Sequence, residues 1–327
     1  MKLFDEILTG NSFISEGIVY DSGKVIGLLV PSTLYGYSSE GQYYVHGPAG
    51  IGDVPRHDCT NLWASIVATQ SILFGSDDEV FAVKKLLEDD NTSRTVSYFC
   101  SIFKSASQVL YAVKQLQKAE VTILGCGGIG SISAVLLAGA GVRKFKIFDP
   151  DYIEKSNLNR QIFWRQADVG KPKVDILKEQ LVSRFDNLEI VTEQISVSGE
   201  TLHKYVSTSN AVLLSADEPL GVALDKAQQL SNRFGFTLVN CGYIHHSASI
   251  SVYKSNSDIN FGLDSPIKWN RNPFFIGPSF GPINAEIAGI VSSIILHDLV
   301  EIFQIESDEY QMFWESNIFP RRYAETL

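Results

Sequence analysis

A glycine-rich turn between an apolar strand and a helix is the first feature of this sequence that can do chemistry. Residues 121–130 read Val-Thr-Ile-Leu-Gly-Cys-Gly-Gly-Ile-Gly. Gly125, Gly127 and Gly130 have the spacing GxGxxG: the first glycine permits a tight turn, the second lets backbone approach a phosphate, and the third lets helix pack on strand. The helix start also offers free N–H groups and a positive dipole end to an anion. The turn, Gly128 included, therefore predicts a nucleotide site, although NAD and FAD enzymes share the pattern.

Acidic, amide and basic side chains crowd the segment after the next strand. Asp149 ends that strand, where its carboxylate can accept a hydrogen bond from a ribose hydroxyl. Arginine binds a phosphate through two parallel hydrogen bonds and lysine supplies a point charge, so a basic cluster suits a triphosphate. A dehydrogenase has little use for such a cluster behind its ribose acid. The segment therefore favours ATP over NAD through Asn157, Arg160, Gln161, Lys171 and Lys173.

The elements that must position these residues alternate between short apolar strands and helices from residue 121 to 242. Such alternation predicts an α/β fold, with a Rossmann-like, doubly wound and mostly parallel sheet covered on both faces. Beyond Gly242 we expect an antiparallel strand over 245–253, a long helix over 283–303 and a final strand over 310–314. This second domain would thus span residues 121–327.

Residues 1–90 do not have this pattern. Short strands separated by Gly, Ser and Pro turns, then helices over 61–74 and 77–88, predict a small α+β module of winged-helix-like type. Residues 91–120 are expected to connect the two parts, as a polar linker over 89–94 followed by a helix over 101–118. The alternative is an extension that only packs on the main domain.

Composition excludes several other classes of protein. The 327 residues carry a formal charge of −10, from 27 basic and 37 acidic side chains, which argues against a nucleic-acid partner. The early acidic residues and short apolar run of the N-terminus do not fit a signal peptide. Stretches such as 287–296 are interrupted by glycine and serine, so we expect no membrane partner and a soluble, cytoplasmic protein. No two of the four cysteines have CxxC spacing, so no structural zinc is expected.

Four stretches occur in an order typical of one family: GCGGIG, DPDYIEKSNLNRQ, DVGKPKV and SADEP. Through them, residues 121–242 resemble the adenylating enzymes that include ThiF, MoeB, HesA and the ubiquitin-activating enzymes. The resemblance implies that a substrate carboxylate attacks the α-phosphate of ATP, giving an acyl-adenylate and pyrophosphate. It also implies that Asp149 holds the ribose and that Asp217 binds Mg²⁺, which prefers one or two carboxylates plus phosphate oxygens. The phosphates and the developing charge would be contacted by Asn157, Arg160, Gln161 and Lys173.

The family resemblance also implies a homodimer. Arg94 lies where relatives supply an arginine to the nucleotide phosphates of the partner subunit, so we expect it to act in trans. His245 and His246 follow the last parallel strand and are candidates for a general base, since histidine titrates near neutrality. The alternative for these histidines is a strand position with one ring facing solvent.

The cysteines narrow the branch of the family. Cys126 and Cys241 are expected to be buried fillers, which disfavours a thioester or persulfide mechanism. In its N-terminal module and its lack of CxxC pairs, the sequence is similar to the peptide-maturation branch of the family. That branch includes the microcin C7 and pantocin A maturation enzymes. This similarity implies that residues 1–90 bind the leader of a ribosomally made precursor peptide by strand addition. An internal nucleophile of the peptide then captures the activated carboxylate, giving a cyclic or amide-type product.

Other activities stay open at this point. Transfer of the γ-phosphoryl group would release ADP instead of AMP. Adenylation of the C-terminal glycine of a ubiquitin-like sulfur carrier needs neither zinc nor a loop cysteine. A non-enzymatic binding subunit is disfavoured by the retained Arg160, Lys173 and Asp217, and an NAD-dependent oxidoreductase by the basic cluster.

Overall fold

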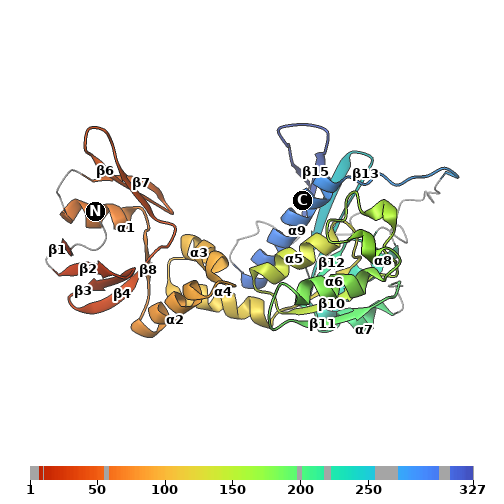
Figure 1. The fold of residues 1–327 in the computed structure, drawn as a ribbon, viewed down its shortest axis with the longest axis horizontal. Helices are drawn as coiled ribbons and strands as arrows, with labels where there is room; N and C mark the ends of the chain where they lie inside the picture. Colours follow the sequence, from red (N-terminus) through yellow and green to blue (C-terminus); the bar gives the residue numbers. More distant parts are fainter. Residues whose placement is uncertain are drawn as a thin grey trace. The chain divides into compact units, whose positions relative to one another are not determined.

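The chain forms two compact units, Met1–Gln115 and Leu116–Leu327 (Figure 1). The computed structural model describes residues 7–9, 11–54, 59–196, 201–216, 222–254, 272–301 and 310–326. Each unit has its own core of buried apolar side chains. The two units are therefore described separately.

Two antiparallel sheets enclose a helix in the first unit (Figure 1). The five-stranded sheet has the order β1-β2-β3-β4-β8, with β1 (Ile7–Thr9), β2 (Ser12–Ser15), β3 (Ile18–Asp21), β4 (Lys24–Leu29) and β8 (Ile72–Phe74). The three-stranded sheet contains β5 (Leu34–Tyr37), β6 (Tyr43–Gly47) and β7 (Gly50–Val54). Helix α1 (Cys59–Ala68) contacts β1, β6 and β7, and its Leu62 and Ile66 are buried in the shared core.

Three further helices complete the first unit: α2 (Asp77–Glu88), α3 (Ser93–Ile102) and α4 (Ala106–Lys118), whose end crosses the unit boundary. The Ser76 N–H donates to Glu79 Oε2 at 2.9 Å, so the start of α2 is capped. Helix α2 contacts both α3 and β4.

Three sequence predictions for this unit were wrong in part. The helix expected over 61–74 ends at Ala68, and β8 follows because Leu73 pairs with Leu28 of β4. The end of the linker expected over 89–94 is helical, since α3 begins at Ser93. The helix expected over 101–118 is broken between α3 and α4. Short apolar runs fit helix and strand alike, so distant pairing decides between them.

The second unit contains an eight-stranded sheet, β11-β10-β9-β12-β13-β14-β15-β16. The first five strands are parallel: β11 (Glu189–Glu193), β10 (Lys144–Phe148), β9 (Glu120–Leu124), β12 (Ala211–Leu214) and β13 (Thr237–Ile244). The other three are antiparallel: β14 (Ser247–Tyr253), β15 (Tyr310–Glu315) and β16 (Ala324–Thr326). The prediction of a doubly wound, mostly parallel sheet is confirmed. Its chain order reverses between β9 and β12, where open α/β sheets bind ligands.

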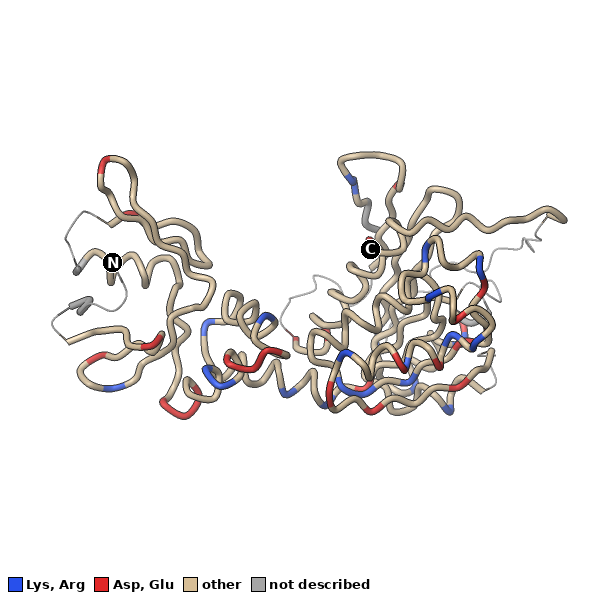
Figure 2. The backbone as a smooth tube through the Cα atoms, viewed as in Figure 1, with Lys and Arg blue, Asp and Glu red and all other residues tan. Residues whose placement is uncertain are grey.

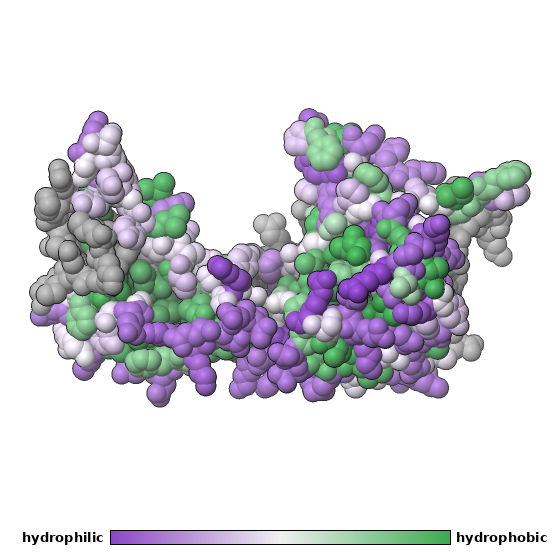
Figure 3. Space-filling model, in the orientation of Figure 1, coloured by the Kyte–Doolittle hydropathy of each residue, from purple (hydrophilic) through white to green (hydrophobic). Residues whose placement is uncertain are grey.

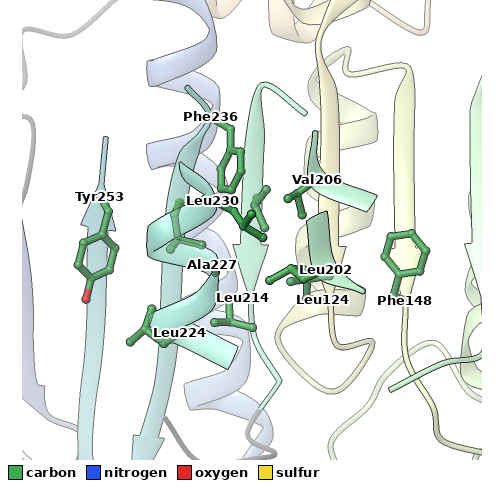
Figure 4. Packing of buried hydrophobic residues seen from close by; sticks show 12 residues of the cluster. Leu124, Phe148, Leu202, Val206, Leu214, Leu224, Ala227, Leu230, Phe236 and Tyr253 are labelled. Carbon is green, nitrogen blue, oxygen red and sulfur yellow. The ribbon is translucent and has the colours of Figure 1, made fainter. Parts of the chain in front are cut away.

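Helices cover both faces of this sheet. Helix α5 (Gly130–Ala140) contacts α6 (Lys173–Val182) and α9 (Gly281–Val300). On the other face, α7 (Leu202–Val206) and α8 (Val222–Phe234) pack on Leu124, Leu214 and Leu238 (Figure 4). Two 3₁₀ helices, Lys155–Asn157 and Gln166–Asp168, lie between β10 and α6. Acidic and basic residues are interspersed along this unit (Figure 2).

Helix α9 is the one helix of the described residues that is long and apolar enough to cross a membrane by length and composition. The long helix expected over 283–303 is thus present, and its apolar run is longer than the stretch 287–296, because glycine and serine interrupt that run without ending it. Its Ile287, Val291 and Ile295 are buried inside the unit.

The segment before α9 shows apolar surface (Figure 3): Phe274 is 89% exposed and Ile276 is 90% exposed.

Candidate nucleotide site

The glycine turn lies at the carboxyl edge of the sheet, at the point where the chain order reverses. Gly125 follows β9 with φ +99°, a conformation that side chains rarely adopt. A Cβ on Gly125 would lie 2.9 Å from Ala216 N, and a Cβ on Gly130 would overlap the Gly125 carbonyl oxygen. Ser215 Oγ donates to that oxygen at 3.0 Å. The turn therefore needs glycine at both positions, as the motif predicts.

Gly127 is the open position of the turn. Apart from its chain neighbours, the nearest described atom to a Cβ built there is Gln161 Nε2, at 4.0 Å. The Trp164 indole N–H donates to Gln161 Oε1 at 2.6 Å, which directs the Gln161 amide nitrogen towards the turn. Gln161 itself is buried. The space over Gly127 and the donor beside it fit a phosphate.

Asp149 is tied to the turn by its carboxylate. Oδ2 accepts the Cys126 N–H at 2.5 Å and Oδ1 accepts the Asp151 N–H at 2.8 Å. Burial raises the pKa of the Asp149 carboxyl above the ordinary aspartate range, against the Lys173 charge and the two backbone bonds, which lower it. Each oxygen keeps a lone pair, so the residue can still accept a ribose hydroxyl.

Lys173 reaches the same place through an antiparallel crossing of two loops. Tyr152 and Pro172 form an isolated bridge, and the Lys173 N–H donates to Asp151 O at 3.1 Å. Lys173 Nζ donates to Asp151 Oδ2 at 2.6 Å, and the lysine side chain is only 7% exposed. The structure therefore brings Asp149, Asp151 and Lys173 together beside the turn. By contrast, Lys171 points to Asp168 and is half exposed.

Asn157 and Arg160 form hydrogen bonds with neighbouring residues of the loop between β10 and α6. The side-chain oxygen Oδ1 of Asn157 accepts the Glu154 N–H at 3.0 Å, and Asn157 is buried. Arg160 Nη1 donates to Ser156 O at 2.6 Å and to Asn159 Oδ1 at 3.0 Å. A Cβ on Gly281 would lie 3.6 Å from the Arg160 Cα, so the loop passes the start of α9. The phosphate roles of both side chains stay predictions.

Asn284 of α9 is a site residue that sequence reasoning missed. Its side chain occupies the space that a Cβ on Gly128 would take. Tyr243, at the end of β13, donates its hydroxyl to Asn284 Oδ1 at 3.0 Å. No spacing links these three positions in the sequence. An Asn near the start of a mostly apolar helix was the available signal.

Other predicted residues lie elsewhere. Arg94 is exposed at the start of α3, in the first unit. Asp217 lies outside the described residues. His245 and His246 occupy the exposed turn between β13 and β14, with His246 Nε2 3.0 Å from Glu315 Oε2. Within the described ranges no cluster of three or more His, Cys, Asp or Glu is placed to hold a metal ion, which leaves a site with fewer carboxylates untested.

The prediction that Cys126 and Cys241 are buried is confirmed. Burial raises the pKa of the Cys241 thiol to about 12, and burial together with the Asp149 charge raises that of Cys126 well above its usual range. A thiolate is the reactive form of cysteine. Neither thiol is therefore suited to attack an activated carboxylate.

The sequence profile of the ThiF family matches residues 101–314, well over half of the chain. The chain belongs to the ThiF family. This match contains the glycine turn, the Asp149–Lys173 cluster and Asn284, and it confirms the resemblance that the motifs indicated.

Two curated relatives in the ThiF family have adenylyltransferase names. The sulfur carrier protein ThiS adenylyltransferase of Escherichia coli K12 is 33% identical over 104 residues, which cover 32% of this chain and 41% of that protein. The adenylyltransferase and sulfurtransferase MOCS3 of Anopheles gambiae is 34% identical over 120 residues, 37% of this chain and 25% of that protein. The chain thus spans less than half the length of these relatives.

Two solved structures share the fold over nearly the whole chain. E. coli MccB in complex with MccA-N7isoASN has a TM-score of 0.68 and 20% identity, covering 92% of this chain and 95% of that one. PaaA has a TM-score of 0.64 and 18% identity, covering 90% of this chain and 98% of that one. The likeness includes the first unit, which the family profile largely omits.

Proposed function

We propose that this ThiF family protein uses ATP to adenylate a carboxylate of a ribosomally made precursor peptide, and that an internal nucleophile of the peptide then captures it. The observation that carries the nucleotide part is the open Gly127 position flanked by Gln161 and the Lys173–Asp149 cluster. The adenylyltransferase names of the curated relatives support the same chemistry.

The residues present fit ATP. The turn at the start of α5 offers backbone N–H groups to a phosphate. Asp149 would accept a ribose hydroxyl, while Lys173 would place a cation near the phosphates. Asp217 would hold Mg²⁺, which would supply positive charge to the phosphates. Gln161 supplies a neutral donor beside Gly127.

The reaction has two displacements. A carboxylate oxygen of the peptide attacks the α-phosphorus, the Pα–O bond to the β-phosphate breaks, and pyrophosphate leaves with the bonding electrons. A nitrogen nucleophile of the peptide then attacks the acyl carbon and loses a proton, and AMP leaves. Lys173 stabilises the negative charge that grows during the first displacement. The release of AMP distinguishes this route from γ-phosphoryl transfer.

The peptide part of the proposal rests on the first unit. MccB has been solved with the peptide MccA and with ATP, and its fold covers both units of this chain. Exposed edge strands bind extended peptides by adding a strand. We assign leader binding to residues 1–90 on these grounds, with residues 121–327 as the adenylation domain. Residues 91–120 would connect these two parts.

The first prediction concerns pyrophosphate exchange. Purified protein with its precursor peptide should exchange labelled pyrophosphate into ATP, and Asp217→Ala should lower the rate by about a hundredfold, because Mg²⁺ neutralises the phosphate charge in the transition state. Asp225→Ala, which removes an exposed carboxylate of α8, is the control and should leave the rate unchanged. Absence of exchange and AMP with every candidate peptide would contradict the proposal, as would an unchanged rate in Asp217→Ala.

A second prediction tests a homodimer in which Arg94 acts at the partner's site. Arg94→Ala and Lys173→Ala should each be nearly inactive, but a mixture refolded together should regain activity. In a mixed dimer one site has Lys173 of its own subunit and Arg94 of the other. About half of the dimers are mixed, so about a quarter of the sites should work. The matched control mixes Arg94→Ala with Lys104→Ala, a variant that loses an exposed lysine instead of Lys173. If Arg94 acts within its own subunit, the first mixture stays inactive.

Adenylation of a ubiquitin-like sulfur carrier is the second candidate, favoured by the names of the curated relatives. The raised thiol pKa values of Cys126 and Cys241 count against sulfur transfer through either residue. Adenylation alone needs no thiol, so substrate identity must decide. Pyrophosphate exchange with a carrier ending in Gly-Gly, but with no peptide, would favour this candidate.

A further inference from the structure

The Asn284 amide has an unused donor next to the glycine turn. Asn284 is 3% exposed, and its Nδ2 has no hydrogen-bond partner among the described residues. A Cβ built on Gly128 would overlap this nitrogen. Gly128 does not have a positive φ, so the turn needs glycine there because of the amide and not because of its backbone conformation.

Tyr243 fixes the direction of the amide. The Tyr243 oxygen accepts the Phe280 N–H at 2.6 Å, and its proton goes to Asn284 Oδ1 at 3.0 Å, the shorter of two contacts, since Ser279 Oγ is 3.5 Å away. Since Oδ1 receives that proton, Nδ2 is the atom that faces Gly128. The same hydroxyl binds Phe280, the N-cap residue of α9, so the helix start and the amide are held by one group.

An unpaired buried donor lowers the stability of a protein and is rare without a functional reason. Ser292, two turns further along the same helix, also has a buried polar atom without a partner among the described residues. Asn284 differs because its free donor faces a phosphate loop. A neutral donor suits this position, since Lys173 already supplies a cation beside the turn.

We propose that Asn284 is a nucleotide-binding residue whose Nδ2 donates to a phosphate oxygen of ATP, with Tyr243 as its positioning residue. This inference rests on the proposed function. Gly128 shields Nδ2 from water in the free protein, so the bond forms when the turn adjusts around the phosphates. The donor then gains the acceptor that it lacks.

The test measures the affinities of ATP, ADP, AMP and adenosine for Asn284→Ala by calorimetry. Loss of a hydrogen bond to a charged group should weaken ATP binding by about tenfold or more, while adenosine binding stays unchanged. The melting temperature of the free protein should fall somewhat, because the variant also removes the acceptor of the Tyr243 hydroxyl, so the difference between ATP and adenosine carries the test. Ser292→Ala is the matched control on α9 and should bind all four ligands like the wild type.

Two outcomes would overturn the inference: equal losses for ATP and adenosine, or unchanged ATP affinity with a lower melting temperature. Both indicate a structural role for Asn284. Should Asn284→Ala fail to fold, Tyr243→Phe keeps the inference testable. It retains the ring, frees the amide to rotate, and should also weaken ATP binding without weakening adenosine binding.

A second experiment uses the close contact between the amide and Gly128. Gly128→Ala should abolish ATP binding, and adding Asn284→Ala should restore part of it, because the smaller side chain leaves room for the new methyl group. Gly127→Ala is the control, because its Cβ would approach Gln161 and not Asn284. Adding Asn284→Ala to that variant should restore nothing. Rescue of both glycine variants, or of neither, would contradict the assigned contact.

Failure of this inference is distinguishable from failure of the proposed function. If the wild type binds ATP and Asn284→Ala binds it equally well, the inference is wrong while peptide adenylation stands. If the wild type binds ATP through Asn284 but activates no peptide, the inference holds and the proposed function fails. Absence of ATP binding in the wild type would contradict both.

Discussion

Replacing Lys173 with alanine should reduce peptide-dependent pyrophosphate exchange by about a hundredfold or more, the usual loss when a group that stabilises transition-state charge is removed. Lys173 Nζ lies 2.6 Å from Asp151 Oδ2, and its side chain is 7% exposed. A cation that water does not screen acts strongly on a developing negative charge. We expect the loss in kcat, because the charge that Lys173 offsets grows during the displacement.

The control for this variant is Lys171→Ala. Lys171 is two residues away, bonds to Asp168 at 3.0 Å and is 50% exposed, so its removal deletes the same charge from the same segment. Its exchange rate should remain within about twofold of the wild type, since exposed pairs contribute little. The melting temperature of Lys173→Ala should fall, because the variant removes a buried side chain and the cation beside the buried Asp149, so kcat is compared for the folded fraction of each variant. Equal losses in both variants would show a general charge effect and would remove Lys173 from the proposed mechanism.

Replacing Asp149 with asparagine should weaken ATP binding by about tenfold or more and destabilise the second unit by about 1–3 kcal/mol. The two carboxylate oxygens accept the Cys126 and Asp151 N–H groups. An amide has one acceptor atom, so its NH₂ group would face one of these donors. Calorimetry of ATP binding and urea unfolding measure the two effects. Asp175→Asn, at an exposed position in the first turn of α6, is the control for the lost charge.

The pH dependence of the wild type gives an independent check on Asp149. Its pKa is raised in the folded protein, mainly by burial. The folded state therefore holds the proton more tightly than the unfolded state, and this contribution to stability disappears as pH rises from the ordinary aspartate range through the raised pKa. ATP affinity should rise over the same window, because the charged carboxylate accepts a ribose hydroxyl best. Asp149→Asn should remove both dependences. An ATP affinity that stays constant over this window in the wild type would contradict the ribose role.

The core of the fold was predictable because its signals are local. The parallel strands β9, β10 and β12 contain short apolar runs, and in the sequence each is followed by polar or glycine-rich residues and then by a helix. The strand β8 was missed because Ile72 and Leu73 fit a helix until β4 is placed beside them. The break between α3 and α4 was missed as well. Neighbouring residues do not contain that information.

The residues of the site also divide into those that local motifs predict and those that only the fold brings to the turn. Gly125, Gly127, Gly130, Asp149 and Lys173 were predicted from motifs, and the structure gathers them at one edge of the sheet. The motif accounts for Gly125 and Gly130 by turn geometry and close backbone approach, both of which are local properties. Asn284 and Tyr243 carry no motif that points to the turn.

Sequence alone was thus sufficient for the glycine turn, the acid behind it and the membership of the ThiF family, because short-range sterics and spacing determine these features. The folded chain was needed to pair Lys173 with Asp151 and to place the Asn284 amide against Gly128. Those arrangements depend on segments far apart in the sequence, and packing between β13, α9 and the turn determines which of their atoms meet.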